Sequence, residues 1–212
     1  MALVGKQFPN IAVDAISFMG DNMRVNILDE AIENAKKVIL FWYPKDFTFV
    51  CPTELHAFQE ALGEFEKRNT TVIGASCDTN EVHFAWLNTP KNQGGIEGVT
   101  YPILADTTRN LSSALGILDI EAGEYNDDTD SLMLVGSNVT YRATYLIDET
   151  GKIFHESVND MPLGRNVHEF LRLIDAYTHV QTKGEVCPAN WEEGKDAMSA
   201  DRKSTASYLS NH

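Results

Sequence analysis

A continuous apolar run, Val38-Ile39-Leu40-Phe41-Trp42-Tyr43, constrains the fold more than any other feature of this chain. Its residues favour strands, none is charged, and Pro44 ends it, which is the pattern of a strand buried on both faces. A helix over about residues 53–68 should follow, because apolar residues recur there at three- and four-residue spacing: Leu55, Phe58, Leu62 and Phe65. A buried strand followed by such a helix predicts an α/β fold.

The rest of the chain extends this pattern. A strand at 71–76 would close a β-α-β unit, and Asn80 can cap a helix that carries Trp86. The glycine-rich segment 93–98 predicts a turn before a short strand at 101–106, and the acidic stretch 121–130 predicts an exposed loop. Residues 141–148 and 153–158 then predict a hairpin, followed by a helix marked by the apolar residues Phe170, Leu171, Ile174 and Tyr177.

The length of 212 residues suits one sizeable α/β domain with an appendage. The chain becomes polar from Thr182 onward, with few core candidates beyond Val186, Trp191, Tyr208 and Leu209. We expect a domain over residues 1–178 and a C-terminal tail over residues 179–212 that lies on a surface, either its own or a partner's.

Composition limits the cellular compartment and the classes of binding partner that we expect. A formal net charge of −14 with no basic patch argues against nucleic acid, and no apolar stretch is long enough to span a membrane. The N-terminal residues lack a signal-peptide core, so we expect a cytoplasmic protein. In that reducing compartment, three cysteines without a C-x-x-C pair favour redox chemistry over a structural disulfide.

Cys51 is the strongest candidate for that chemistry, because it sits where the predicted helix begins. Unpaired N–H groups and the positive end of the helix dipole both stabilise a thiolate at such a position. A second cysteine, Cys187, is then a candidate partner for whatever oxidised sulfur Cys51 forms.

Three further residues could form a substrate site beside this thiolate. Arg142 lies on a predicted strand and could aim its guanidinium at the helix terminus, while the hydroxyl of Thr48 can donate and accept. Pro44 has no N–H to compete for substrate and could shield the sulfur from water. Together with Cys51 they suit cleavage of an O–O bond. Taken singly, a lone cysteine is more often an inert buried residue, a strand arginine a surface charge, and a proline or threonine a plain loop residue.

The sequence resembles the typical two-cysteine peroxiredoxins, and is similar to the peroxidase subunit of bacterial alkyl hydroperoxide reductase, over nearly its whole length. The PxxxTxxC motif is present as Pro44, Thr48 and Cys51 within FWYPKDFTFVCPTE. The family's strand arginine matches Arg142 in YRATYLID, its second arginine matches Arg165 in MPLGRNV, and its resolving cysteine matches Cys187 in GEVCPANW.

This resemblance implies a thioredoxin-like fold with a central mixed β-sheet flanked by helices and a C-terminal extension. It implies that Cys51 is the peroxidatic cysteine, that Thr48 and Arg142 polarise the peroxide, and that Glu54 and Arg165 buttress the site. Trp86 matches a tryptophan near the family's active site, although a core role fits it equally well.

The implied cycle reduces hydrogen peroxide or alkyl hydroperoxides, oxidises Cys51 to a sulfenic acid and forms a disulfide with Cys187 of a second subunit. Thioredoxin or a flavoprotein disulfide reductase would restore both thiols. The first helical turn must open for the disulfide to form. The implied assembly is a homodimer and a ring of five dimers, with no cofactor and no metal.

Departures from the family pattern bear on over-oxidation. Sensitive members carry GGLG and a C-terminal YF pair, whereas this chain has Gly94-Gly95-Ile96-Glu97 and Tyr208-Leu209, which predicts intermediate sensitivity. Cys77 follows the 71–76 strand and is expected to be structural and largely buried. The segment 121–135 is longer than usual, and its role is open.

Other functions have less support in the sequence. A thioredoxin-like oxidoreductase would need a cysteine where Glu54 stands, and the scattered cysteines and histidines lack the spacing of a zinc site. A holdase chaperone or a peroxide-signalling relay that uses the same cysteines is the main alternative.

Overall fold

The computed structural model describes residues 2–211, with Ala122 described by its backbone alone. Met1 and His212, the outer ends of the two predicted domains, lie outside the described residues. The chain divides into two compact units, the first ending at Arg165 and the second beginning at Asn166.

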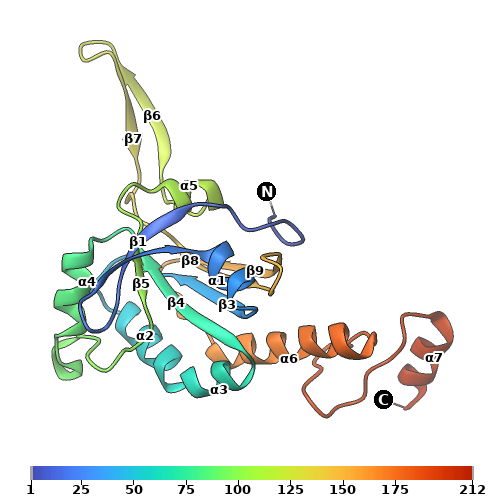
Figure 1. Cartoon of the computed structure of the whole chain (residues 1–212). Coiled ribbons are helices and arrows are strands. Elements are labelled where there is room, and N and C mark those ends of the chain that lie inside the picture. Colours follow the sequence, from blue (N-terminus) through green and yellow to red (C-terminus); the bar gives the residue numbers. More distant parts are fainter. Residues whose placement is uncertain (1, 212) are drawn as a thin grey trace. The chain divides into compact units, whose positions relative to one another are not determined.

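The first unit is built on a seven-stranded mixed sheet in the order β2-β1-β5-β4-β3-β8-β9 (Figure 1). β3 pairs in parallel with β4, and β4 with β5, while β8 runs antiparallel to β3 and β1 antiparallel to β5. The strands are β1 (Ala12–Ile16), β2 (Asn22–Asn26), β3 (Lys37–Trp42), β4 (Thr70–Ser76), β5 (Ile103–Ala105), β8 (Arg142–Ile147) and β9 (Ile153–Asn159). The mixed α/β architecture expected from the sequence is confirmed.

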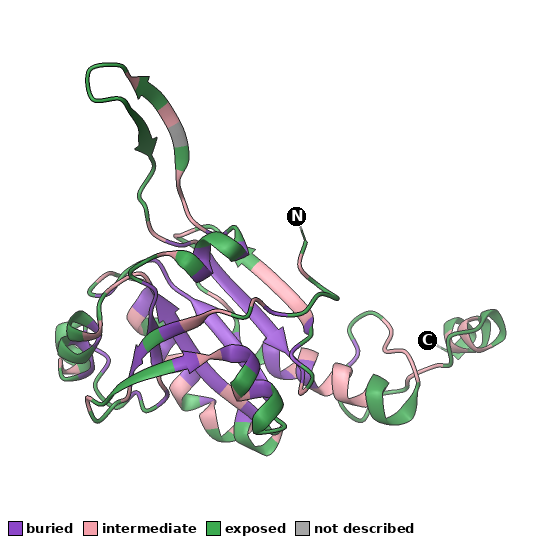
Figure 2. Ribbon diagram, turned by 45° about the horizontal axis from the view of Figure 1, so that its top comes forward, coloured by how far each residue is buried: buried purple, intermediate pink, exposed green. Residues whose placement is uncertain are grey.

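Both faces of the central strand β3 are covered, as its continuous apolar run predicts. On one face, Val38, Leu40 and Trp42 belong to a core that also contains buried residues of helices α1 (Ile27–Glu33) and α5 (Asn110–Leu115). On the other face, Phe41 stacks on Phe58 of helix α2 (Cys51–Glu60), with ring centroids 3.9 Å apart. Figure 2 shows the resulting band of buried residues along the sheet.

The prediction of a single helix over residues 53–68 is wrong, because the structure has two helices there, α2 and α3 (Leu62–Lys67), separated at Ala61. Gly63, a weak helix former, follows this break. Helix α4 (Asn80–Leu87) is capped by Thr79, whose hydroxyl accepts from the Val82 N–H, and not by Asn80 as expected. The glycine-rich segment is a turn that follows the short 3₁₀ helix η1 (Lys91–Gln93), as predicted.

The prediction of an exposed loop at 121–130 is also wrong, because two antiparallel strands, β6 (Glu121–Asn126) and β7 (Ser131–Val135), form a hairpin there. The side chain of Asn126 accepts hydrogen bonds from the N–H groups of Asp128 and Thr129, and Asp130 takes a positive φ of 49°. These features make the tight turn that allows the strands to pair.

The second unit consists of helix α6 (Val167–Lys183), an irregular segment and helix α7 (Arg202–Asn211). Helix α6 was predicted from its apolar residues, whereas helix α7 was not. Trp191 is buried, as expected of a core candidate in the tail. Its indole donates to the Lys195 carbonyl, and its own carbonyl accepts from Arg172. The irregular segment is held further by a bridge between Val186 and Met198.

Candidate active site

Cys51 is the first residue of α2 and is fully buried. β3 delivers the chain to Tyr43, and a short loop that includes Phe47 in a positive-φ conformation returns it to the helix start. Val50, which precedes the helix, offers no side-chain cap. The N–H groups of Thr53 and Glu54 donate to the Val50 carbonyl and Pro52 has no N–H, so this terminus acts on an anion mainly through the positive end of the helix dipole. The predicted location of Cys51 at a helix start is confirmed.

Two side chains reach the sulfur of Cys51. The Thr48 hydroxyl oxygen lies 3.0 Å from Sγ and 2.8 Å from the Lys45 carbonyl oxygen, so its single proton can serve one acceptor at a time. Nη1 of Arg142, from β8, lies 3.4 Å from Sγ. The structure therefore brings a neutral donor and a fixed cation to the same thiol, as the sequence predicted.

Glu54 holds the guanidinium groups around this site. Its Oε2 accepts from Nη1 of Arg142 at 2.6 Å, and its Oε1 accepts from Nε of Arg165 at 2.9 Å. Arg165 also donates to the Ala143 carbonyl, and its guanidinium lies 5.2 Å from the Phe41 ring centroid. Glu54 and both arginines are almost completely buried, so a thiolate at Cys51 would complete a balanced set of two cations and two anions.

Trp86 and Pro44 flank the loop that carries Thr48. Trp86 is fully buried in α4, where its ring packs at 5.9 Å from Tyr43 and 5.8 Å from Phe47, and its indole donates to the Gly94 carbonyl. It is thus a core residue that also supports the active-site loop. Pro44 is buried in the same loop, and its shielding of the sulfur stays a prediction.

A buried polar network behind this loop was not predicted from the sequence. Nδ1 of His83 lies 2.7 Å from Asp46, which also accepts from the Tyr43 hydroxyl, and the Asp46 N–H donates to Asp78. Burial raises the pKa of Asp46, against the opposing hydrogen bond with His83. The only available signal was the position of His83 three residues before Trp86 on the same helix.

Cys187 lies in the second unit, where its sulfur is 3.6 Å from the Ala176 carbonyl oxygen. Burial raises the pKa of this thiol, and nearby Arg172 opposes the shift. All three cysteines are free thiols. The pairing of Cys187 with Cys51 stays a prediction.

Cys77 has the environment of a structural residue. Its sulfur is partly buried and lies 3.9 Å from the Ser112 hydroxyl. Burial raises the pKa of this thiol to about 11, which disfavours the reactive thiolate at neutral pH.

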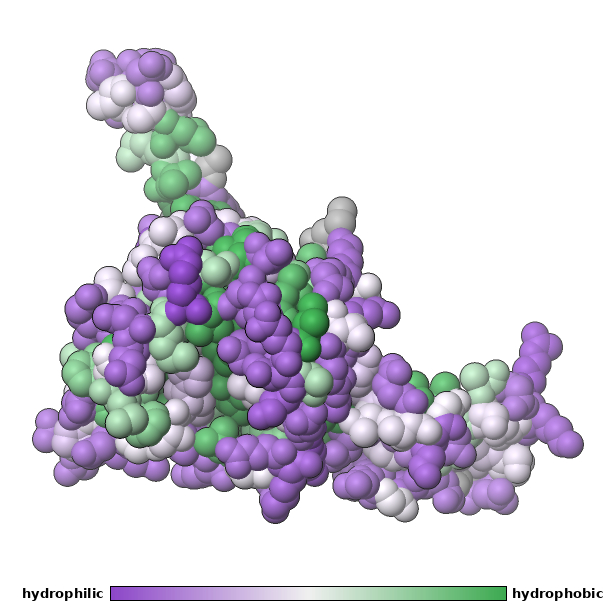
Figure 3. Space-filling view, viewed as in Figure 1, coloured by the Kyte–Doolittle hydropathy of each residue, from purple (hydrophilic) through white to green (hydrophobic). Residues whose placement is uncertain are grey.

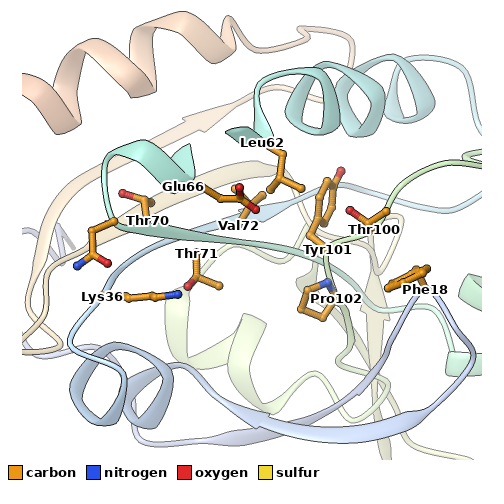
Figure 4. Close-up of a pocket in the computed structure, with 11 residues that line it drawn as sticks. Phe18, Lys36, Leu62, Glu66, Thr70, Thr71, Val72, Thr100, Tyr101 and Pro102 are labelled. Atoms are coloured by element: carbon orange, nitrogen blue, oxygen red, sulfur yellow. The ribbon is translucent and has the colours of Figure 1, made fainter. Parts of the chain in front are cut away.

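One surface pocket lies beside helix α3 and strand β4, and another lies along helix α2. The first, of about 380 Å³, is lined by residues that include Lys36, Leu62, Glu66, Thr71 and Tyr101, and Figure 4 shows these side chains converging on it. It contains none of the predicted site residues. The pocket along α2 has a volume of about 310 Å³ and is lined by residues that include Pro52, His56 and Gly95.

Comparison with known proteins identifies the chain. The AhpC/TSA family model matches residues 4–156, and the model of the C-terminal domain of 1-Cys peroxiredoxin matches residues 176–211. The chain belongs to the AhpC/TSA family of peroxiredoxins.

Curated relatives are similar in sequence to this peroxiredoxin over nearly its full length. Alkyl hydroperoxide reductase C of Helicobacter pylori is 41% identical, with 98% of this chain and 96% of the relative covered. Peroxiredoxin-1 of Gekko japonicus is 38% identical, with 100% and 97% covered.

Among solved structures, the reduced 2-Cys peroxiredoxin of Plasmodium vivax superposes with a TM-score of 0.87 at 38% identity, covering 99% of this chain and 100% of that one. The thioredoxin-like fold is confirmed, and the protein is a thiol-dependent peroxidase.

Within residues 2–211, no helix is long and apolar enough to cross a membrane. The same residues contain no cluster of three or more His, Cys, Asp or Glu side chains placed to hold a metal ion.

Proposed function

We propose that Cys51 is the peroxidatic residue of this peroxidase. The observation that carries the proposal is the buried sulfur held between the Thr48 hydroxyl at 3.0 Å and the Arg142 guanidinium at 3.4 Å. The thiolate forms an S–O bond to one peroxide oxygen as the O–O bond breaks. The leaving oxygen takes a proton and departs as water or an alcohol, while Cys51 becomes a sulfenic acid.

In the second step, the thiolate of Cys187 from another subunit attacks the sulfenic acid, forming a disulfide and releasing water. Burial of Cys51 supports a requirement for opening of the first turn of α2, because a chain segment cannot reach a fully buried sulfur. An external dithiol, thioredoxin or a flavoprotein disulfide reductase, then restores both thiols by exchange.

Arg142 and Thr48 stabilise the charge that develops on the leaving oxygen, and Glu54 with Arg165 holds Arg142 in place. Pro44 excludes water, and Trp86 supports the loop. We assign the peroxidase domain to residues 1–178 and the resolving tail to residues 179–212, a division supported by the two family-model matches at 4–156 and 176–211. We also propose a cytoplasmic location, a homodimer and a ring of five dimers.

Stopped-flow measurement of peroxide consumption tests these roles. Cys51→Ser should abolish peroxide reduction, and full activity in this variant would refute the proposal. Cys187→Ser should keep the first reduction of peroxide but lose turnover with a protein dithiol. Normal turnover in that variant would rule out the two-cysteine cycle while leaving the peroxidase assignment intact.

A matched pair of substitutions at Thr48 isolates its hydroxyl. Thr48→Val should slow the reaction with peroxide on the order of a hundredfold, because a donor to the leaving oxygen is lost. Thr48→Ser keeps the hydroxyl and should retain most of the rate. Equal rates for both variants would remove Thr48 from the mechanism.

A non-reducing gel after one equivalent of peroxide tests the arrangement of the two cysteines. A disulfide-linked dimer is expected from the wild type and from neither single cysteine variant. A disulfide confined to one chain would contradict the proposed pairing between subunits.

A further inference from the structure

The hairpin β6–β7 presents an unusual strand edge. Within the described residues, β7 pairs with β6 and with no other strand, so its outer edge carries unpaired N–H and C=O groups. The four apolar side chains of β7 are between 48% and 62% exposed: Leu132, Met133, Leu134 and Val135. Figure 1 shows the hairpin projecting from the body of the first unit, and Figure 3 shows apolar side chains along its shaft and hydrophilic ones at its tip.

The two edges of this hairpin differ in how they resist pairing. β6 carries Glu121 and Glu124, and its register is broken by a bulge between Ala122 and Tyr125, both of which discourage a further strand. β7 has no charged residue, no proline and no such protection after its first residue, Ser131. Its sequence has the character of a strand that is normally paired.

We propose that β7 pairs antiparallel with β7 of a second copy of this chain, about a twofold axis that passes beside Met133. The two hairpins would then form a continuous four-stranded sheet in the order β6-β7-β7-β6. Such a twofold contact is closed, because each β7 edge satisfies the other and the outer edges that remain are the protected ones of β6. A two-stranded hairpin is marginal in water, whereas four strands with an apolar face are not.

Charge complementarity supports a second copy as the occupant. Pairing centred on Met133 places Ser131 of one chain opposite Val135 of the other and carries the acidic tip, Asp127 to Asp130, toward the base of the other hairpin. Arg109 lies at that base, where its Nε donates to the Asn138 carbonyl at 3.2 Å. The turn that carries Asp128 lies beyond the paired residues, on the side of the other hairpin's base, so each acidic tip would approach one arginine.

The acidic groups at the base do not cancel this attraction. Asp119 accepts from the Ser137 N–H and hydroxyl and from the Tyr141 hydroxyl, and these donors lower the pKa of its carboxyl. Glu121 lies opposite Val135 on β6, across the hairpin from the proposed axis. Because the protein as a whole is acidic, an arginine at this place gives the two acidic tips a local counter-charge.

Disulfide trapping tests the pairing directly. The full-length chain with Cys51→Ser, Cys77→Ala and Cys187→Ser would carry either Met133→Cys on β7 or, as a matched control, Tyr125→Cys on the exposed shaft of β6. Circular dichroism would verify that each variant is folded. Mild oxidation should give at least about five times more covalent dimer from Met133→Cys, because only residues close to the axis meet disulfide geometry.

Equal trapping at both positions, or none at Met133→Cys in folded protein, would overturn the proposal. A charge exchange provides a second, independent test by sedimentation. Arg109→Glu and Asp128→Arg should each weaken the hairpin-dependent association, and the double variant should recover it. Failure of the double variant to recover association would also overturn the pairing, and all three variants should keep the wild-type rate with peroxide.

Discussion

Glu54 is the residue through which the charges around Cys51 are held together. One carboxylate binds Arg142 through Oε2 and Arg165 through both oxygens, and all three side chains are buried. A buried ion pair of this kind adds little net stability over apolar residues, but removal of one member leaves uncompensated charge in a low-dielectric site. The cluster is therefore best understood as a positioning device for Arg142.

The substitution Glu54→Gln should separate these effects. We expect a loss of about 3–5 kcal/mol in the free energy of unfolding, measured by chemical denaturation, because two buried guanidinium groups lose their counter-charge. We also expect the peroxide reaction to slow on the order of tenfold or more, since Arg142 is no longer fixed.

The control is Glu169→Gln, which breaks an exposed Glu–Arg pair on α6. It should cost below about 1 kcal/mol and leave the peroxide rate unchanged. Equal destabilisation by both substitutions would contradict the special role of Glu54.

Cys77 makes stability depend on pH in the alkaline range. Its thiol pKa is raised by burial from 9.0 to about 11, so between these values the folded chain keeps a proton that the unfolded chain has lost. Stability from this group is therefore complete below pH 9 and lost as pH rises toward 11.

Relative to Cys77→Ala, the wild type should lose on the order of 2 kcal/mol across that range, measured by denaturant unfolding at several pH values. The comparison with the variant removes the contribution of tyrosines that titrate in the same range. A difference between the two proteins that does not change with pH would contradict the buried-thiol assignment. The variant should reduce peroxide at the wild-type rate.

At the scale of elements, local patterns predicted strands β3, β4, β5, β8 and β9 of the large sheet but not β1 or β2. Burial of β3 and of the hairpin β8–β9 within the sheet requires apolar, strand-favouring residues, and this local pattern is visible in the sequence. Breaks and turns were harder. The separation of α2 from α3 at Ala61 leaves the apolar spacing intact, so periodicity cannot detect it.

The hairpin β6–β7 was missed because its acidic tip dominates the composition. The signal that could have found it is Asn126, whose side chain makes the turn, placed between Tyr125 and the apolar residues of β7. The residues around Cys51 were predicted through the resemblance to peroxiredoxins. The His83–Asp46 contact depends on tertiary structure that joins α4 to the active-site loop, and no local pattern reports it.

Helix α2 must be formed to hold Cys51 beside Arg142 and must open for the disulfide to form. The Tyr101 hydroxyl restrains it by donating to the Leu55 carbonyl at 2.8 Å. Tyr101→Phe should weaken the folded helix by about 0.5–1.5 kcal/mol and favour opening. Resolution by Cys187 would then compete better with a second peroxide, so over-oxidation should require roughly 2- to 10-fold more peroxide.

Intact-mass measurement of sulfinic acid during turnover checks this expectation. Tyr141→Phe serves as the control, because it removes a tyrosine hydrogen bond to Asp119, outside α2. Unchanged sensitivity in Tyr101→Phe would show that opening of α2 does not limit resolution. Wild-type sensitivity as high as that of GGLG- and YF-containing members would contradict the intermediate level expected from Ile96, Glu97 and Leu209.

At the scale of the whole molecule, the net charge of −14 should act on charged reactants and leave neutral ones unaffected. Hydrogen peroxide is neutral, so its reaction with Cys51 should change less than about twofold as salt rises from about 10 to 200 mM. Reduction of the disulfide by an anionic phosphine such as tris(carboxyethyl)phosphine should accelerate several-fold over the same range, because salt screens its repulsion from the acidic surface. Reduction by an uncharged phosphine, tris(hydroxypropyl)phosphine, provides the control and should stay nearly constant, because no charged species takes part in its attack. If the anionic reductant slows with salt, a local cationic surface around the disulfide outweighs the net charge, and an acidic protein reductant would then be attracted to that site.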